Sequence, residues 1–132
     1  FAEAMQKRRC LVPASGFYEW AKSDSGKQPY YIHCTGDAPI AFAGIWSKIA
    51  TDTGHQVTFA IVTKPSLPAI AHIHARMPVM LDAKTGKDWL YGDAATAHKA
   101  AERGAPLLTA YPVSARVNKA DADDVGLLAS IA

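Results

Sequence analysis

Short apolar runs, each bounded by turn-forming residues, are the feature that most limits how this chain can fold. Turn signals of Gly, Pro, Ser and Asp recur at residues 13–16, 23–26, 35–39, 51–54 and 82–87. The runs between them have strand length, and the VTFAIVT run of residues 57–63 is β-branched and aromatic. This spacing is typical of a domain built mainly from short strands.

The pattern predicts strands over residues 10–12, 16–20, 30–33, 40–46, 57–63, 78–81 and 107–113. The 40–46 run should be buried on both faces, 57–63 should be a central strand, and 47–56 should be a hairpin loop. Helices are expected over residues 1–9, 93–103 and 124–132, with Asp93 as a cap and Gly104 as a stop, and helical turns near 65–72 and 88–91. The expected fold class is α+β, with short strands in a strongly bent sheet or pseudo-barrel and a few peripheral helices.

Length and composition fit one soluble domain over residues 1–132. The hydrophobic share is 49% and the net charge is +2, which permits nucleic-acid binding without requiring it. No apolar run approaches the roughly 18 residues of a membrane span. The first residues lack the apolar region of a signal peptide, and Cys10 and Cys34 form no CxxC. We therefore expect a cytoplasmic protein with reduced thiols, and the opening within a helix suggests that an N-terminal part is missing.

Glu19 is a charged residue in a largely apolar segment, and it lies between Tyr18 and Trp20. A carboxylate beside two aromatic rings is partly desolvated, which favours the protonated form and suits general acid–base chemistry. Simple strand alternation offers the other interpretation, in which Glu19 is a surface residue and the aromatic rings point inward.

His72, His74 and Arg76 lie within five positions of one another after a predicted buried strand. The two histidines could share a face of an extended chain, but no third metal ligand stands at a recognisable spacing, so we predict no metal. One histidine as proton donor with Arg76 as an anion anchor is the better hypothesis. His74 could instead be a packed loop residue, and Ser114 and Asn118 are typical of a capped turn.

Three segments resemble blocks of the SOS response-associated peptidase (SRAP) family, which processes abasic sites. They are RRCLVPASGFYEW (residues 8–20), IVTKPSLPAIAHIHARMPVML (residues 61–81) and YPVSARVN (residues 111–118), and they occur in the family's order over nearly all of the chain. By position, the resemblance assigns catalytic roles to Glu19 and His74. It assigns DNA contacts to Arg76, Thr63 and Trp20.

The resemblance implies a sensor that binds single-stranded DNA and forms a covalent crosslink at abasic sites, with no cofactor. In the family, a cysteine directly after the initiator Met forms a thiazolidine with the sugar aldehyde, after autoproteolytic removal of that Met. Neither Cys10 nor Cys34 can replace it, because the chemistry needs the α-amino group and the thiol on one residue. The sequence starts after that cysteine and after an upstream Asn and Arg, so these residues alone are expected to be inactive.

Other functions stay open at this point. The chain could be a DNA-binding remnant without crosslinking activity, a conventional peptidase acting through Glu19 and His74, or a structural interaction module. The expected partner is single-stranded DNA with abasic sites, the expected oligomeric state is a monomer, and no membrane partner is expected.

Overall fold

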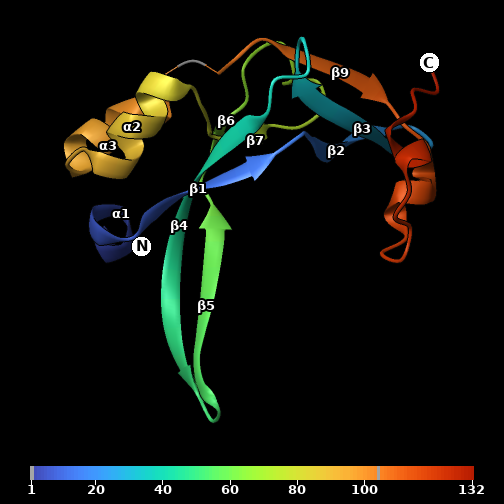
Figure 1. Cartoon of the computed structure of the whole chain (residues 1–132). Coiled ribbons are helices and arrows are strands. Elements are labelled where there is room, and N and C mark those ends of the chain that lie inside the picture. The colour runs from blue at the N-terminus through green and yellow to red at the C-terminus, as the bar shows by residue number, and fades with distance from the viewer. Residues whose placement is uncertain (1, 104) are drawn as a thin grey trace. The chain divides into compact units, whose positions relative to one another are not determined.

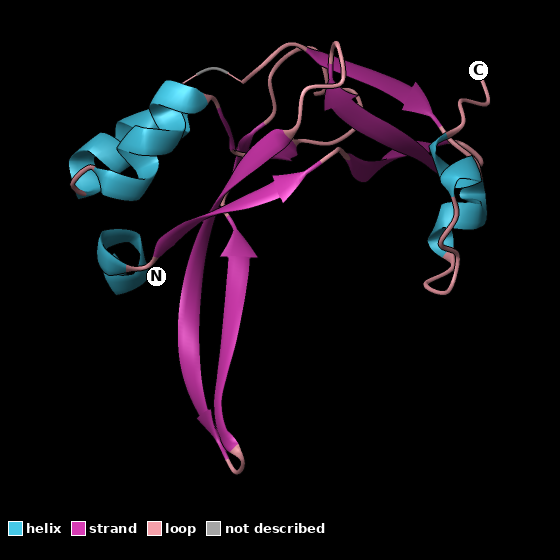
Figure 2. Ribbon diagram, in the orientation of Figure 1, coloured by secondary structure: helices cyan, strands magenta, loops and turns pink. Residues whose placement is uncertain are grey.

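The computed structural model describes residues 2–103 and 105–132 (Figures 1 and 2). The chain divides into two compact units, each assembled from separate stretches of sequence. The first unit comprises Phe1–Ala14, Ile40–Lys64 and Pro78–Pro106, and the second comprises Ser15–Pro39, Pro65–Met77 and Leu107–Ala132. The sequence predicts one domain over residues 1–132. The division into two compact units does not decide whether they fold as one domain, so that expectation stays a prediction.

The first unit is built on an antiparallel sheet in the order β1-β4-β5, with β8 also paired to β4. Its strands are β1 (Arg9–Ala14), β4 (Ile40–Thr51), β5 (Gly54–Ile61) and β8 (Met80–Leu81). From Trp46 onward β4 pairs with β5 alone, and the two strands form a long hairpin closed by a turn at residues 52–53 (Figure 1). The apolar first half of β4 therefore lies inside the sheet, as its composition predicts.

The helices of this unit are α1 (Ala2–Lys7), α2 (Ala83–Tyr91) and α3 (Ala94–Glu102). Asp82 caps α2 by accepting a hydrogen bond from the Thr85 amide at 2.8 Å, and the Asp82 amide donates back to Thr85 Oγ1 at 2.9 Å. Asp93 caps α3 in the same way, accepting from the Thr96 amide at 2.8 Å. No described helix is long and apolar enough to cross a membrane.

Trp89 of α2 is the centre of the first unit's core. Its side chain is fully buried, and its Nε1 donates a hydrogen bond to the Cys10 carbonyl at 2.9 Å. Burying a large apolar side chain contributes roughly 1.5–3 kcal/mol, so this cluster carries much of the unit's stability. The other buried members of the cluster are Ala4, Ala43, Ile45, Val79, Leu81 and Ala97.

The basic pair at the end of α1 is occupied within the same unit. Arg8 Nε donates to the Trp46 carbonyl at 3.0 Å, and Arg8 also pairs with Glu3. Arg9 donates to the carbonyls of Met5, Trp89 and Gly92. These arginines therefore hold helix ends and strand together rather than standing free for a ligand.

The second unit contains a three-stranded antiparallel sheet in the order β2-β3-β9. Its strands are β2 (Phe17–Ser23), β3 (Gly26–Cys34) and β9 (Leu108–Pro112), followed by two 3-10 turns, η1 (Ala115–Asn118) and η2 (Val125–Leu128). Ile32 and Val113 are fully buried, and the Tyr31 ring packs at a tilt against Tyr18 and Tyr111, with ring centroids 5.5 and 5.9 Å away. The aromatic cluster on this sheet makes β2 a firm support for the residues it carries.

A compact loop of residues 66–75 belongs to the second unit. It lies between two short strands that pair with each other, β6 (Thr63–Pro65) and β7 (Arg76–Pro78). Ile70 and Ile73 are buried, and the Ser66 amide donates to the Ala75 carbonyl at 2.9 Å. The loop is therefore anchored by its apolar residues, while its histidines are exposed.

The fold class is α+β, as the sequence predicts, and the described strands form several sheets rather than a closed barrel. The prediction of a central strand at residues 57–63 is wrong, because β5 ends the sheet path and leaves Val57 and Phe59 63% and 60% exposed. The predicted loop at 47–56 is mostly strand. Its residues are mostly polar and exposed along a hairpin, a composition that resembles a loop when read without its partner strand.

One turn prediction and one helix prediction also need correction. The turn signals at 82–87 belong to α2, because Asp82 and Thr85 form a cap rather than a turn between strands. The expected helix at 124–132 is limited to η2, and Ser130 beyond it forms a β-bridge with Val113. Helix α3 fits its prediction to within about one residue at each end, and the stop expected at Gly104 lies outside the described residues.

Candidate functional site

Strand β2 separates Glu19 from its aromatic neighbours by simple alternation. Glu19 lies opposite Tyr30 of β3 in the register, whereas Trp20 lies opposite Pro29 and so faces the other side. Glu19 Oε1 accepts a hydrogen bond from the Trp20 amide at 3.2 Å, and the residue is half-buried. Glu19 is therefore half-buried on the face opposite the Trp20 side chain, as strand alternation implies, and its role stays a prediction.

The face of the sheet that carries Glu19 also approaches the histidine loop. Tyr30, the cross-strand neighbour of Glu19, meets the ring of His72 edge-on, with centroids 6.2 Å apart. The contact connects strand β3 with the loop of residues 66–75 inside the second unit. It gives His72 a packing role and places it beside, rather than at, the predicted catalytic position.

His74 has a backbone environment suited to a proton carrier. Its Nδ1 lies 3.1 Å from the Arg76 amide nitrogen and 3.1 Å from the Arg76 carbonyl oxygen. A neutral ring with its proton on Nε2 accepts from that amide at Nδ1, and a protonated ring donates from Nδ1 to that carbonyl. Both protonation states thus keep a partner at Nδ1, and Nε2 stays available for exchange with a ligand.

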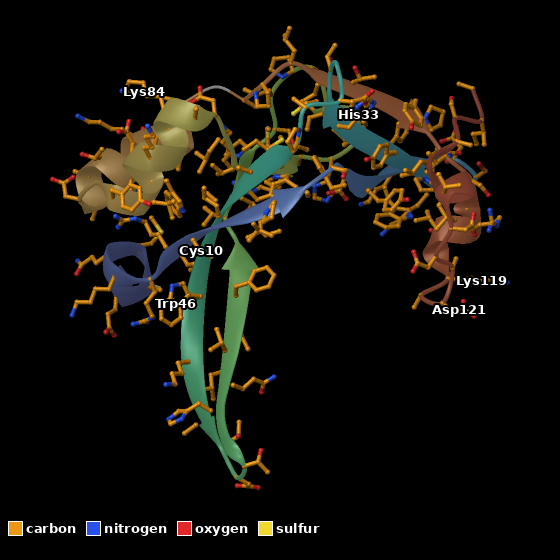
Figure 3. The ribbon with its side chains drawn as sticks, viewed as in Figure 1. Cys10, His33, Trp46, Lys84, Lys119 and Asp121 are labelled. Carbon is orange, nitrogen blue, oxygen red and sulfur yellow. The ribbon has the colours of Figure 1, made fainter. Side chains whose placement is uncertain are left out.

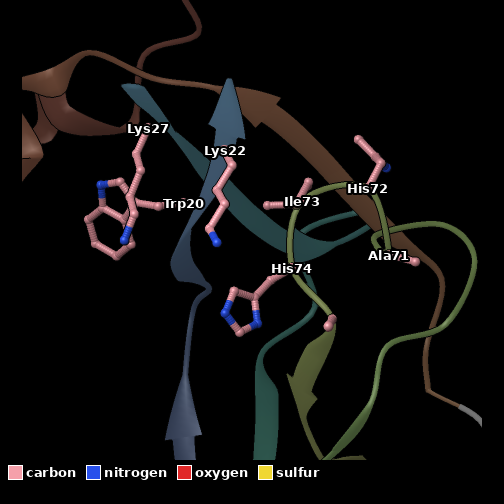
Figure 4. Close-up of a pocket in the computed structure, with 8 residues that line it drawn as sticks. Trp20, Lys22, Lys27, Ala71, His72, Ile73 and His74 are labelled. Atoms are coloured by element: carbon pink, nitrogen blue, oxygen red, sulfur yellow. The ribbon is translucent and has the colours of Figure 1, made fainter. Parts of the chain in front are cut away.

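A hollow of about 360 Å³ joins β2 and β3 to the histidine loop (Figure 4). It is lined by Trp20, Lys22, Lys27 and residues 71–75 of the loop, which include His72 and His74. Figure 4 shows the ring of His74 and the ammonium group of Lys22 directed toward each other across it. The structure thereby brings two of the predicted site residues, Trp20 and His74, to one open space.

Trp20 also borders a second hollow, of about 550 Å³, on the side of η1 and η2. The indole Nε1 donates a hydrogen bond to Asn118 Oδ1 at 2.7 Å. The second hollow is mainly apolar, with Val117, Val125, Leu127 and Leu128 in its wall beside Asp123 and Asp124. The sequence predicts Asn118 to be a turn residue, and no local pattern marks it as the partner of a tryptophan 98 positions away.

The remaining predicted residues have clear places. Arg76 is exposed at the start of β7, and its backbone holds His74 as described. Thr63 is exposed at the start of β6 and belongs to the first unit. Four of the five predicted residues, Glu19, Trp20, His74 and Arg76, therefore lie in one unit.

The two cysteines are poor nucleophiles in this structure. Both are free thiols, and burial raises the pKa of Cys10 and of Cys34 above the usual thiol value. A raised pKa lowers the fraction of reactive thiolate at neutral pH. Among residues 2–103 and 105–132, no three His, Cys, Asp or Glu side chains gather in a way that could hold a metal ion.

The sequence is similar to that of a known protein family and of several named relatives. A family model described as SOS response associated peptidase (SRAP) matches residues 1–120. The Abasic site processing protein YoaM of Bacillus subtilis is 38% identical over 68% of this chain and 40% of its own length. The Abasic site processing protein HMCES of Xenopus tropicalis is 30% identical over 89% of this chain and 42% of its own length. The chain thus spans about two fifths of the length of these relatives.

Solved structures show the same fold. A protein from Bacteroides thetaiotaomicron matches with a TM-score of 0.87 and 27% identity, over 98% of this chain and 60% of that one. A phage-related protein from Bordetella bronchiseptica matches with a TM-score of 0.68 and 37% identity, over 85% of this chain and 56% of that one.

Proposed function

Because this chain belongs to the SOS response associated peptidase (SRAP) family, we propose that it is the part of an abasic-site processing protein that binds single-stranded DNA and transfers protons during covalent capture of the lesion. The observation that carries the proposal is the hollow shared by Trp20 and His74, beside a strand that holds Glu19 half-buried. Relatives named abasic site processing proteins support it.

In the proposed reaction, His74 acts first. An abasic site in its closed form is a cyclic hemiacetal. It opens to an aldehyde when the ring oxygen gains a proton, the bond from C1 to that oxygen breaks, and the C1 hydroxyl loses its proton to water. Nε2 of His74 supplies that proton, and the Arg76 backbone accommodates the ring in both protonation states. An anion-binding role for Arg76 near this ring follows from its exposed position two residues away.

Capture of the aldehyde then needs a primary amine and a thiol on one residue, which the family supplies from a cysteine outside residues 1–132. The amine adds to the aldehyde carbon and water leaves as the imine forms. The thiol sulfur then adds to the imine carbon, the imine nitrogen gains a proton, and a thiazolidine ring closes. We assign Glu19 to the proton transfers at the amine, Trp20 to stacking on a neighbouring base, and Thr63 to a DNA contact.

The test uses the natural protein that carries residues 1–132 and a single-stranded oligonucleotide with one abasic site. Covalent product is followed over time on a denaturing gel. Glu19→Gln and His74→Gln should each slow capture by about 10²-fold or more, the usual contribution of a general acid or base. His98→Gln, an exposed histidine of α3 in the other unit, is the matched control and should react like wild type. Unchanged rates in both site variants would refute the assignment.

A peptidase activity is the second candidate, because the family description itself contains that word. It would use the same Glu19 and His74, with autoproteolytic removal of an initiator Met as the natural case. Intact-mass spectrometry of wild type and Glu19→Gln separates the two activities. Retention of Met in the variant alone supports processing, and cleavage of added peptides would extend it to other substrates.

A further inference from the structure

Two lysines of the second unit have no assigned role and share the hollow with His74. Lys22 of β2 and Lys27 of β3 are direct cross-strand partners, next to the turn that closes the β2–β3 hairpin. Like charges in directly opposed positions destabilise a sheet, so this arrangement has a cost in the free protein. A bound anion between the two ammonium groups would remove that cost.

The hairpin keeps the pair in register. Ser23 Oγ donates to the Gly26 carbonyl at 2.9 Å across the turn. Gly26 adopts a φ of 122°, which a residue with a side chain rarely adopts. The backbone that carries both lysines is therefore fixed, and only the flexible side-chain ends need to adjust to a ligand.

The hollow itself is positive. Among the described residues, its wall contains Lys22, Lys27, His72 and His74 and no Asp or Glu. The second hollow that Trp20 borders carries Asp123 and Asp124 beside Lys119. Trp20 thus borders both a cationic space and a mainly apolar space with acidic residues, and only the first would attract a phosphate.

The size of the space also fits a piece of nucleic acid. Ligand sites usually enclose about 300–1,000 Å³, and the hollow of about 360 Å³ lies near the lower end of that range. A phosphodiester with part of its sugar would fill it, with the imidazole of His74 at the edge nearest the sugar.

We propose that Lys22 and Lys27 clamp a backbone phosphate of the DNA strand next to the residue on which His74 acts. This inference rests on the proposed function, because it places the phosphate relative to the reacting sugar. The lysines are positioning residues: they hold the strand and transfer no proton. Their loss should therefore weaken DNA binding in a salt-dependent way and leave capture at saturating DNA nearly unchanged.

The experiment measures the affinity of the natural protein for a fluorescent single strand by anisotropy, across a series of salt concentrations. Each lysine–phosphate contact contributes a slope of about −0.7 in log K against log salt for single strands. For the double variant Lys22→Gln/Lys27→Gln, the slope of log K against log salt should become shallower by up to about 1.4, the sum of two contacts, and binding at low salt should be weaker. Lys22→Arg/Lys27→Arg should keep both, since the charge is retained.

Two controls make the outcome specific. Lys119→Gln removes a lysine from the second hollow, and Lys84→Gln removes an exposed lysine from α2 of the other unit (Figure 3). Both should leave the slope within about 0.3 of the wild-type value, less than half of one phosphate contact. An unchanged slope in the double variant would overturn the clamp, and so would a loss equal to that of the controls.

Capture rates separate this proposal from the previous one. If wild type captures an abasic strand and the double variant binds as tightly as wild type, the clamp fails and the proposed function stands. If the double variant loses the slope on undamaged strands while wild type captures nothing, the lysines bind phosphate and the proposed reaction fails. Wild type that binds neither strand overturns both. Melting by circular dichroism verifies that each variant is folded.

Discussion

The indole Nε1 of Trp20 donates a hydrogen bond to Oδ1 of Asn118 at 2.7 Å, which joins β2 to the end of η1. The bond fixes the plane of a half-buried ring that borders two hollows of opposite character. An indole has one polar donor, so a single acceptor is enough to select its orientation. Asn118 therefore governs how much of the ring faces each hollow, although it lines neither.

Asn118→Ala should release the indole and weaken binding of single-stranded DNA. A hydrogen bond of this kind contributes about 0.5–1.5 kcal/mol, which corresponds to roughly a two- to twelvefold rise in Kd. The Trp20 indole N–H resonance should shift in an ¹⁵N-correlation spectrum. Ser114→Ala is the control, because it removes the hydroxyl that accepts from the Arg116 amide in the same turn and leaves the indole bond in place. Equal effects of both variants would contradict the specific role of Asn118.

Two glycines should respond to alanine with opposite signs. A Cβ on Gly16 would lie 2.3 Å from Tyr31 Oη, and Tyr31 is packed among aromatic rings, so Gly16→Ala should destabilise the protein by about 1–3 kcal/mol. A Cβ on Gly86, inside α2, meets only Leu11 Cδ1 at 3.9 Å. Gly86→Ala should stabilise by about 0.5–1 kcal/mol, since glycine is the costlier helix residue. Urea unfolding measures both, and a common sign would refute the packing argument.

The capping carboxylate of Asp82 should make stability depend on pH at the acid end. Hydrogen bonds from the Thr85 amide and hydroxyl hold the pKa of Asp82 below its usual value of 3.8. A folded-state pKa below the unfolded one means that its contribution is complete above about pH 4 and is lost as the pH falls through the folded value. Asp82→Asn should therefore lower the urea midpoint near neutrality, and its difference from wild type should shrink as the pH falls below 3.8. Asp52→Asn, in the exposed hairpin turn, is the control, and a difference that stays constant over this acid range would contradict the cap.

Trp89→Phe should cost more than the same change at Trp46. Trp89 is fully buried and its Nε1 donates to the Cys10 carbonyl at 2.9 Å, so the change leaves a cavity and removes that bond. We expect a loss of roughly 1–3 kcal/mol in the free energy of unfolding. Trp46, half-buried on β4, should lose less than about 1 kcal/mol. The two unfolding curves decide the matter, and equal losses would show that Trp89 is not the centre of the core.

Local chemistry explains which elements the sequence predicts. The apolar run that starts at Ile40 and the capped helix after Asp93 are local signals, and both appear in the structure. The sequence predicts the strand at residues 57–63 but not its place at the edge of the sheet, because its β-branched residues do not reveal whether a neighbouring strand covers them. The cap at Asp82 looked like a turn because Asp serves both purposes.

The same contrast holds for the candidate site. Glu19, Trp20, His74 and Arg76 lie in segments whose letters carry the family resemblance, and the structure locates them in one unit. Their roles stay predictions. The sequence does not single out Asn118, Lys22 or Lys27, because turn-forming amides and surface lysines are common. The strand register shows that the two lysines face each other, and a long-range hydrogen bond shows that Asn118 is the partner of Trp20.

The interleaved course of the chain has a consequence for any attempt to isolate the cationic hollow. Trp20, His74 and Asn118 come from three stretches, and polypeptide of the other unit runs between each of them. No single continuous segment of the chain contains the second unit alone. A proteolytic cut within residues 40–64 or 78–106 would fall inside the first unit and would also break the covalent connection between parts of the second unit. During synthesis on the ribosome, Trp20 is made 98 residues before Asn118, so its indole must wait for that length of chain before its acceptor exists.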